Sequence, residues 1–392
     1  MKKYFSHILL NYFRLLAIIQ LAKNPKIVIV GITGSAGKSS TLNACQAALS
    51  PKYKVKTNGG SNSESGIPLS ILGIKVISYS PMDWLKYALL APIKLITNWQ
   101  KYDFFLCEMG IDKPGDMSYL LKIFKPHIGI FLNVSLVHCE NFNNINEIGL
   151  EKAKMIAALP STGYALLNIN DPIVAKTSLN TLAKKVPLKP IAISFDNYAT
   201  PASFNISIGA AVSLAKLYDI DQSSAINNIK TNLVLPPSRS SLLTGINHST
   251  IIDSSYNSSP LACSEMLEVL QKYPSPRIAI LGDMREMGQQ SESAHQQIYR
   301  QALKSSDTLI SVGPMTSKYF GDKSIKFAFW WQALEYIKQN LPDKSTILIK
   351  GSQNTIYLEE IVKSLSTSAQ PICRQSQHWQ KVKQKFHQQN VK

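Results

Sequence analysis

The clearest chemical signal in this chain is a glycine- and serine-rich loop that follows a short apolar run within residues 26–41. Two glycines, Gly34 and Gly37, allow the backbone to approach an anion, and the N–H groups that open the next helix point toward it. Lys38 adds a positive charge, and the Ser39 hydroxyl can bind Mg²⁺. The sequence therefore predicts a phosphate-binding P-loop. Its expected nucleotide contacts are Gly34, Ser35, Ala36, Gly37, Lys38, Ser39 and Ser40.

Gly31 stands one position before the place that the standard G-x-x-x-x-G-K motif gives to its first glycine, and Ile32 occupies that place. This shift leaves the rest of the loop unchanged. The loop alone therefore indicates nucleotide binding without saying which nucleotide chemistry follows.

Three further side chains are expected near the loop, because ligands of parallel sheets bind at the carboxyl ends of the strands. Glu108 ends an apolar run, where its carboxylate is a natural Mg²⁺ ligand. His138 follows a strand expected to end at residue 133, and Lys152 lies on a helix expected after residue 146. Each has a simpler explanation, since a loop histidine or a lysine beside a glutamate is usually solvated. Only their order and spacing together favour a site.

These residues need a sheet to position them, and the pattern provides one. Short apolar runs alternate with helical stretches, which predicts parallel sheets flanked by helices. The expected strands are residues 26–31, 103–108, 127–133, 164–168 and 190–194, then 250–253, 277–282, 308–312 and 345–350. We therefore expect an α/β protein with a P-loop parallel-sheet ATPase domain followed by a smaller Rossmann-like α/β domain.

A proline-rich break at residues 235–238 marks the expected domain boundary. The expected divisions are a basic apolar helix over 1–24, the ATPase domain over 25–235, the second domain over 236–366 and a polar tail over 367–392. We expect the tail to fray because it is rich in Gln, Lys and Ser.

The amino-acid composition limits the classes of partner that we expect for this protein. The chain has 392 residues and a net charge of +17, with 45% hydrophobic and 17% charged residues. The basic residues are spread along the chain and no RNA-binding signature or zinc finger is present, so we expect no nucleic-acid partner. Five cysteines without a CxxC pattern indicate a reduced, cytoplasmic protein. A phosphorylated substrate accounts for the basic balance more simply.

Two segments, residues 1–24 and 84–99, are both basic and apolar. Asn11 and Arg14 interrupt the first, which makes it a poor signal peptide and a poor membrane span. We favour amphipathic helices packed on the domain. Weak contact with the inner face of a membrane is the alternative.

Taken together, these motifs resemble the Mur ligase family, ATP-dependent amide-forming enzymes of cell-wall peptide synthesis. The resemblance covers about residues 26–365 and agrees best with the branch that adds D-alanyl-D-alanine. It rests on residues 31–40, 65–69, 108–116, 133–138, 167–171, 251–260, 281–288 and 349–352, together with Lys152.

The resemblance assigns roles to the residues of the first domain. Lys38 and the loop N–H groups would hold the ATP phosphates. Ser39 and Glu108 would bind one Mg²⁺, and His138 with Glu108 would help to bind a second. Lys152 matches the lysine that CO₂ carbamylates, which turns a cation into a carboxylate-like metal ligand.

Lys154 is the other candidate for carbamylation. Its side chain points about 200° away from that of Lys152 around the helix, so only one of the two can face the site.

In the second domain the resemblance implies that Arg239 reaches the phosphates, Asp253 binds the ribose and His295 lies near the nucleotide. The expected substrate-binding residues are Asn62, Lys350 and Ser352. The implied reaction moves the γ-phosphoryl group of ATP to a peptide carboxylate, and an amine then attacks the acyl phosphate.

The expected function is addition of D-alanyl-D-alanine or a similar amine to a cell-wall peptide precursor in peptidoglycan biosynthesis, by a monomer. A ligase for another carboxylate, of the folate polyglutamate or poly-amino-acid type, and a catalytically weak nucleotide-binding partner protein stay open as alternatives. Residues 114–116 and 282–284 favour the cell-wall branch.

Several positions depart from the family pattern. The phosphate loop begins about 30 residues from the start, so we expect no counterpart of the family's UDP-binding N-terminal domain. Substitutions occur at Ser63, Ser238, Ser254 and Gln353, where the family has Asn, Gly, Asp and Arg. These changes affect substrate surfaces and spare the phosphate and metal residues.

Overall fold

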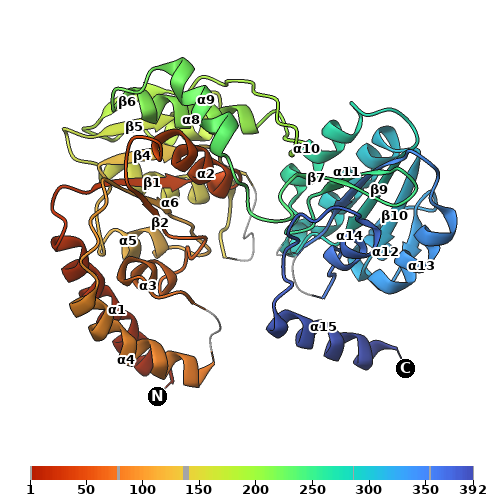
Figure 1. The fold of residues 1–392 in the computed structure, drawn as a ribbon, viewed down its shortest axis with the longest axis horizontal. Helices are drawn as coiled ribbons and strands as arrows, with labels where there is room; N and C mark the ends of the chain where they lie inside the picture. Colours follow the sequence, from red (N-terminus) through yellow and green to blue (C-terminus); the bar gives the residue numbers. More distant parts are fainter. Residues whose placement is uncertain (1, 77–79, 136–140, 286, 353–354, 392) are drawn as a thin grey trace. The chain divides into compact units, whose positions relative to one another are not determined.

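The computed structural model describes residues 2–391 except 77–79, 136–140, 286 and 353–354. The chain divides into two compact units, Met1–Ile193 with Ser203–Val234, and Ser194–Ala202 with Leu235–Lys392. Each described unit contains one six-stranded sheet with helices against it (Figure 1). The expected α/β class, with a parallel-sheet domain followed by a second α/β domain, is confirmed.

The first sheet has the strand order β2-β3-β1-β4-β5-β6, and all its pairs are parallel. Its strands are β1 Val28–Thr33, β2 Val55–Thr57, β3 Phe104–Glu108, β4 Ile128–Phe131, β5 Tyr164–Leu167 and β6 Lys184–Pro187. Strand β1 lies between β3 and β4, so the carboxyl ends of these three strands meet where the P-loop begins.

The fifth strand expected from the sequence is wrong. Residues 190–194 lie outside the strands, and β6 runs over Lys184–Pro187 instead. This strand pairs on one side only, and its two lysines are exposed. An edge strand does not need an apolar pattern, so the pattern could not reveal it.

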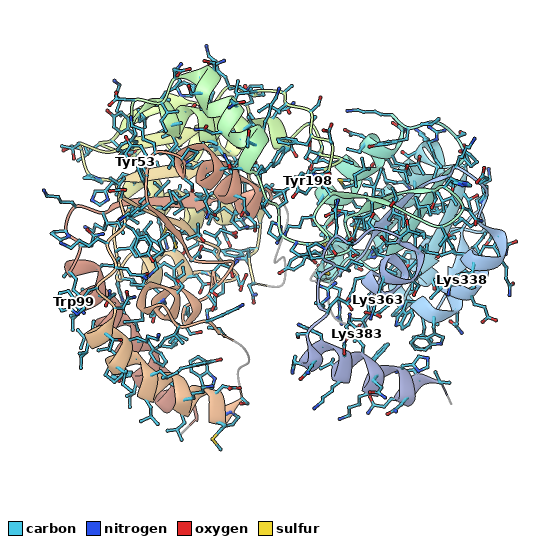
Figure 2. The ribbon with its side chains drawn as sticks, viewed as in Figure 1. Tyr53, Trp99, Tyr198, Lys338, Lys363 and Lys383 are labelled. Carbon is cyan, nitrogen blue, oxygen red and sulfur yellow. The ribbon has the colours of Figure 1, made fainter. Side chains whose placement is uncertain are left out.

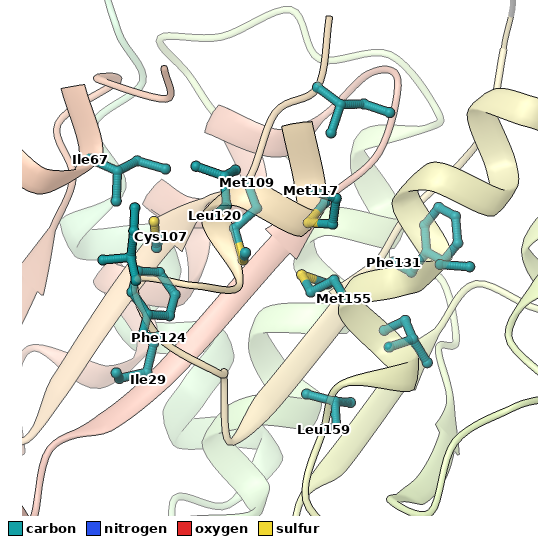
Figure 3. Close-up of a cluster of buried hydrophobic side chains, with 14 of the residues drawn as sticks. Ile29, Ile67, Cys107, Met109, Met117, Leu120, Phe124, Phe131, Met155 and Leu159 are labelled. Carbon is teal, nitrogen blue, oxygen red and sulfur yellow. The ribbon is translucent and has the colours of Figure 1, made fainter. Parts of the chain in front are cut away.

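Helices cover both faces of the first sheet (Figure 1). α2 Lys38–Leu49, α8 Phe204–Lys216 and α9 Gln222–Asn232 pack together on one face. The other face carries α5 Asp116–Leu120, α6 Ile145–Ala157 and α7 Pro172–Thr177. Inward side chains such as Ile29, Cys107 and Phe131 meet Met155 of α6 and Leu159, which follows that helix, in a continuous core (Figure 3).

Three more helices, α1 Lys2–Ala22, α3 Gly66–Leu72 and α4 Pro81–Thr97, share a separate small core. Phe13 of α1, Leu69 of α3 and Tyr87 of α4 are buried in it. The Tyr12 hydroxyl donates to the Ala88 carbonyl at 3.1 Å, which ties α1 to α4. Among the described helices, none is long and apolar enough to cross a membrane.

The second sheet has the order β11-β10-β9-β12-β8-β7, with only β7 antiparallel to its neighbour. Its strands are β7 Ser241–Thr244, β8 Thr250–Asp253, β9 Arg277–Gly282, β10 Thr308–Val312, β11 Ile325–Phe327 and β12 Thr346–Lys350. α10 Pro260–Leu270 and α11 Ser291–Ser305 cover one face, and α13 Trp330–Asn340 and α14 Glu359–Leu365 cover the other. The second unit also contains a 3₁₀ turn, Gly288–Gln290, and a short helix, α12 Pro314–Tyr319.

The polar tail is helical where fraying was expected. α15 spans Gln377–Asn390, and its Lys383 (labelled in Figure 2) is buried beside Glu359 and Glu360 of α14. Ion pairs between Lys383 and the carboxylates of Glu359 and Glu360 hold the helix. The pattern of hydrophobic residues gives no sign of such ion pairs, so the sequence did not predict this contact.

Candidate functional site

The P-loop lies between β1 and α2, and the side chain of a residue just after β4 fixes its shape. Gly37 caps α2 with a left-handed φ of 81°, a conformation that favours glycine. Just after β4, Asn133 accepts from the Ala36 N–H at 2.8 Å and donates to the Ala36 carbonyl at 3.2 Å. Sequence reasoning assigned no role to Asn133, although its place directly after a strand was a usable signal.

Two lysines meet at one carbonyl of the loop. Lys38 Nζ lies 2.8 Å from the Gly34 carbonyl oxygen. Lys152 Nζ lies 3.2 Å from the same oxygen, although Lys152 and Gly34 are 118 positions apart in the sequence. Lys152 is only 1% exposed. The structure therefore brings two amines from different helices to the phosphate loop.

The buried position of Lys152 determines its protonation. Burial lowers the pKa of Lys152 well below its usual range, and the nearby charge of Lys38 lowers it further against a smaller opposing effect of Asp112. Burial therefore favours the uncharged form of the Lys152 amine more than in an exposed lysine. A neutral amine is the nucleophilic form that can combine with CO₂.

Lys154 faces away from the site. Its side chain is 45% exposed and its Nζ lies 2.5 Å from Glu151 Oε2. Glu151 is itself buried and accepts the Met117 N–H at 3.0 Å. Of the two lysines that the sequence left open, only Lys152 points toward the loop.

Glu108 ends β3 directly beside β1, in register with Ile32. It is 3% exposed, and Asn58 holds its backbone by accepting the Glu108 N–H at 3.1 Å and donating to the Glu108 carbonyl at 3.2 Å. His138 lies outside the described residues. No group of three His, Cys, Asp or Glu residues suited to a metal occurs in the described part. A carboxylate and a hydroxyl beside a phosphate site nevertheless fit Mg²⁺, which keeps several waters and phosphate oxygens as ligands.

The displaced glycine of the motif has a packing role. A Cβ on Gly31 would lie 2.7 Å from Met155 Sδ, 2.8 Å from Met109 Sδ and 2.9 Å from Pro126 Cγ. Met109 and Met155 lie close together in Figure 3. Because Met155 belongs to α6, this glycine allows the helix that carries Lys152 to pack closely on the sheet.

The predicted acceptor residue Asn62, in the loop after β2, lies against the segment that follows Glu108. A Cβ on Gly110 would be 3.3 Å from Asn62 Nδ2. The Asn62 loop and the end of β3 are therefore neighbours.

In the second unit, the predicted ribose ligand Asp253 ends β8 and is fully buried. Its Oδ1 accepts from the Ser255 N–H at 3.0 Å and from the Ser255 hydroxyl at 2.7 Å, whereas its Oδ2 has no hydrogen-bond partner among the described residues. Burial raises the pKa of Asp253, against the lowering effect of its serine hydrogen bonds.

Lys350 ends β12, which lies next to β8 in the sheet, and Ser352 follows it. Lys350 Nζ donates to the Asn257 carbonyl at 2.9 Å, and burial lowers its pKa to about 8. The Ser352 hydroxyl accepts the Arg285 N–H at 3.1 Å. The two residues therefore join the loops that follow β8, β9 and β12.

His295 is fully buried and both ring nitrogens are used. Nε2 accepts the Met284 N–H at 3.1 Å, and Nδ1 lies 2.6 Å from the Ser291 carbonyl, to which it donates. Burial lowers the pKa of His295. This neutral imidazole holds the loop after β9, and its closeness to a nucleotide stays a prediction.

Arg239 lies in the linker region, with its guanidinium carbon 4.4 Å from the centre of the Tyr256 ring. Its Nε has no hydrogen-bond partner among the described residues. Its approach to the phosphates stays a prediction.

Sequence reasoning missed Arg374, which fixes the loop after β8. Arg374 pairs through two nitrogens with the two carboxylate oxygens of Glu359, each at 2.8 Å. It also donates to the Ser255 carbonyl at 3.0 Å and to the Tyr256 carbonyl at 2.9 Å. The polar tail thus braces the segment that carries Asp253 and Tyr256.

Comparison with known proteins identifies the family. The model described as Mur ligase middle domain matches residues 32–233, and the one described as Mur ligase, glutamate ligase domain, matches residues 238–353. The chain belongs to the Mur ligase family. The family resemblance of the sequence is confirmed.

Named relatives of this Mur ligase support its assignment to the family. It is 24% identical over 386 residues to the UDP-N-acetylmuramoyl-tripeptide–D-alanyl-D-alanine ligase of Buchnera aphidicola, covering 90% of this chain and 79% of that protein. It is also 24% identical over 380 residues to the enzyme of the same name from Escherichia coli, covering 86% and 76%. The MurF ligase of Thermotoga maritima, solved in complex with ADP, has the same fold with a TM-score of 0.76 at 21% identity, covering 91% and 83%.

We predict that Arg374→Ala lowers the free energy of unfolding by about 3 kcal/mol, because it leaves the buried Glu359 carboxylate with fewer partners. Burial raises the pKa of Glu359, but hydrogen bonding and charge from Arg374 and Lys383 outweigh it and hold the pKa below its usual 4.5. The stabilisation is thus present above pH 4.5 and is lost as the pH falls through the lower folded-state value. Urea unfolding between pH 3 and 7 measures both effects.

Two variants control this test. Lys385→Ala removes an exposed lysine of α15, the helix that follows Arg374, and should change stability by less than about 0.5 kcal/mol. Arg374→Gln combined with Glu359→Gln removes both charges and should cost less than Arg374→Ala alone. Equal losses for Arg374→Ala and Lys385→Ala would contradict the brace.

Proposed function

We propose that this Mur ligase activates a carboxylate of a cell-wall peptide with ATP and joins it to D-alanyl-D-alanine or a similar amine. One observation carries the proposal: the buried Lys152 Nζ lies 3.2 Å from the Gly34 carbonyl of the P-loop, and the strand next to β1 ends in the buried Glu108. The two curated relatives named above are ligases for D-alanyl-D-alanine, which supports this choice of amine.

The P-loop would hold ATP, which supplies the phosphoryl group. Backbone N–H groups at the start of α2 face the phosphates, and Lys38 offsets negative charge on the transferred group. Ser39 and Glu108 would hold Mg²⁺, which supplies further positive charge at the phosphoryl oxygens. His138 with Glu108 would help to hold a second ion.

Lys152 would carry a carbamate. In its uncharged form its nitrogen would attack the carbon of CO₂: an N–C bond forms, one C–O π bond opens and one proton leaves for solvent. The product is an anion where a cation would repel metal. Burial disfavours an uncompensated charge of either sign, so bound Mg²⁺ would have to offset the charge of the carbamate.

Residues of the second unit would complete the reaction. We propose that Asp253 accepts a ribose hydroxyl, and that Lys350 and Ser352 hold the incoming amine. Arg239 would contact the phosphates and Asn62 the acceptor. Because all these residues belong to one chain, a monomer suffices.

We predict that Lys38→Ala abolishes ATP turnover and leaves the fold intact, because losing a contact to the transferred phosphoryl group costs several kcal/mol of barrier and each ~1.4 kcal/mol is tenfold in rate. The assay is phosphate release from ATP with a muramoyl tripeptide and D-alanyl-D-alanine, with and without each acceptor. Lys26→Ala, an exposed lysine just before β1, is the control. Turnover near wild type in Lys38→Ala would refute the phosphate-site assignment.

We predict that Lys152→Ala lowers activity at least a hundredfold and that a short carboxylate such as acetate partly restores it, because it replaces the carbamate as a metal ligand. Lys154→Ala on the same helix should keep nearly full activity, since that lysine faces Glu151. Degassing the assay buffer to remove CO₂ should also lower the activity of the wild-type protein. Full activity of Lys152→Ala would transfer the role to another residue.

We also propose that α1 and α4 rest on an anionic membrane surface at the inner face of the cell membrane. Along α4 an exposed apolar stripe repeats with helical spacing at Met82, Leu85, Leu89, Ile93 and Ile96. Lys86 and Lys94 are exposed on the same helix. An apolar face bordered by lysines is typical of helices that lie in a membrane interface.

We predict that the protein co-sediments with anionic phosphatidylglycerol vesicles at low salt and less at high salt. Leu89→Glu with Ile93→Glu should abolish binding without unfolding the chain, because both side chains are more than half exposed. Leu182→Glu, an exposed leucine outside both helices, is the matched control. Absence of wild-type binding at low salt would leave only a packing role for α1 and α4.

A further inference from the structure

A cavity of about 700 Å³ lies in the first unit, between α1, α4 and the two loops that follow β2 and β3. This volume is within the roughly 300–1,000 Å³ of small-molecule sites. None of the residues given a role in phosphate or metal binding lines it. The cavity is therefore a separate feature of the molecule, and its walls indicate which ligand it would accept.

The charged side chains that line the cavity are mostly acidic. Glu64, Asp112 and Asp116 contribute three carboxylates, and Lys113 contributes one ammonium. The Lys113 side chain is 59% exposed, and its Nζ lies 3.8 Å from Glu64 and 3.9 Å from Asp116. Contacts of this length from an exposed lysine contribute little. The cavity therefore favours a cationic ligand over an anionic one.

One of these carboxylates is buried and incompletely hydrogen-bonded. Asp116 is 8% exposed, and its Oδ2 accepts the N–H groups of Asp112 and Lys113 at 2.8 and 3.0 Å. Its Oδ1 has no hydrogen-bond partner among the described residues. A buried polar atom without a partner is costly, and a charged donor forms a stronger hydrogen bond to a carboxylate than a neutral donor does. An ammonium group is therefore the ligand group that best completes Asp116.

The three carboxylates do not form a metal site. Across the residues that the structure describes, no group of three His, Cys, Asp or Glu side chains is placed to hold a metal ion. A metal ion needs ligands that converge on one point. An ammonium group has three N–H donors that point in different directions, so it can bond to acceptors that lie apart.

Much of the remaining lining is apolar. Leu9 and Leu10 of α1 and Trp84, Leu85 and Ala88 of α4 contribute to it. Hydrocarbon gains free energy by leaving water for such a wall, and the face of a tryptophan ring also attracts a cation. A ligand that matches both the acidic and the apolar side chains has an ammonium group on an aliphatic chain.

We propose that this cavity binds a primary ammonium group carried on an aliphatic chain, with the ammonium at Asp116 and the chain along α1 and α4. The ammonium can belong to a free amine or to a side chain of the acceptor peptide, because Asn62, the predicted acceptor residue, lines the same cavity. The second source rests on the proposed ligase function, and the first does not.

Calorimetric titration of the full chain with hexylammonium tests the binding, and hexan-1-ol is the uncharged ligand of the same chain length. We expect hexylammonium to bind at least tenfold more tightly than hexan-1-ol. Asp116→Asn keeps one side-chain oxygen for the two N–H groups and puts an amide NH₂ in place of the other. It should weaken hexylammonium binding at least tenfold and leave hexan-1-ol binding unchanged. Asp322→Asn, the same change at an exposed position of the second unit, should alter neither.

Filling the cavity tests the location of the site. Ala88→Trp places a large ring among the lining residues and should abolish binding of both ligands. Ala202→Trp, at an exposed alanine outside the lining, should bind both ligands like the wild type. Thermal unfolding of each variant checks that the chain is folded. Equal affinities of the wild type for the two ligands, or no effect of Asp116→Asn, would overturn the inference.

The phosphate-release assay with D-alanyl-D-alanine distinguishes the two sources of the ammonium. It compares UDP-linked tripeptides that end in lysine or in norleucine, which differ only by the side-chain amine. A KM at least tenfold lower for the lysine peptide, lost in Asp116→Asn, would assign the ammonium to the acceptor. Equal KM values together with hexylammonium binding would assign it to a free amine. Turnover of neither peptide would refute the proposed ligase function, and the calorimetric result would still decide the inference.

Discussion

The carbonyl oxygen of Gly34 is the atom on which the first unit's chemistry depends. It lies 2.8 Å from Lys38 Nζ and 3.2 Å from Lys152 Nζ, so it fixes the Lys38 amine and the buried Lys152 amine relative to each other. Desolvation, with the nearby charge of Lys38, lowers the pKa of Lys152 well below its usual range, because an ammonium there would be buried beside a second cation. A P-loop that otherwise only holds phosphate thereby gains a residue suited to covalent modification.

Packing makes this arrangement possible. α6 can bring Lys152 to the loop because Gly31 has no Cβ under Met155, and because Asn133 holds the loop from the neighbouring strand. A side chain at Gly31 would have to displace two methionines and a proline from a dense core. The position that looked irregular as a phosphate motif is therefore explained by helix–sheet packing.

The second unit depends on buried polar groups in a comparable way. Asp253 at the end of β8, Lys350 at the end of β12 and His295 on α11 are all buried, and each hydrogen-bonds a loop beside it. Arg374 joins this set from the tail by neutralising Glu359 and binding two loop carbonyls. Such groups are stable only when their partners are in place, so the loops are held in one conformation.

The sequence by itself determined the α/β class, the P-loop, nearly all the central strands and the Mur ligase family, because helix and strand periodicity and loop motifs are local properties. The edge strand β6 and the ordered tail were not predictable, since one lies at a sheet edge and the other is held by ion pairs to residues far along the chain. Only the tertiary structure decided between Lys152 and Lys154 and showed the roles of Asn133 and Arg374. Burial and partners depend on segments that approach one another only when the chain folds.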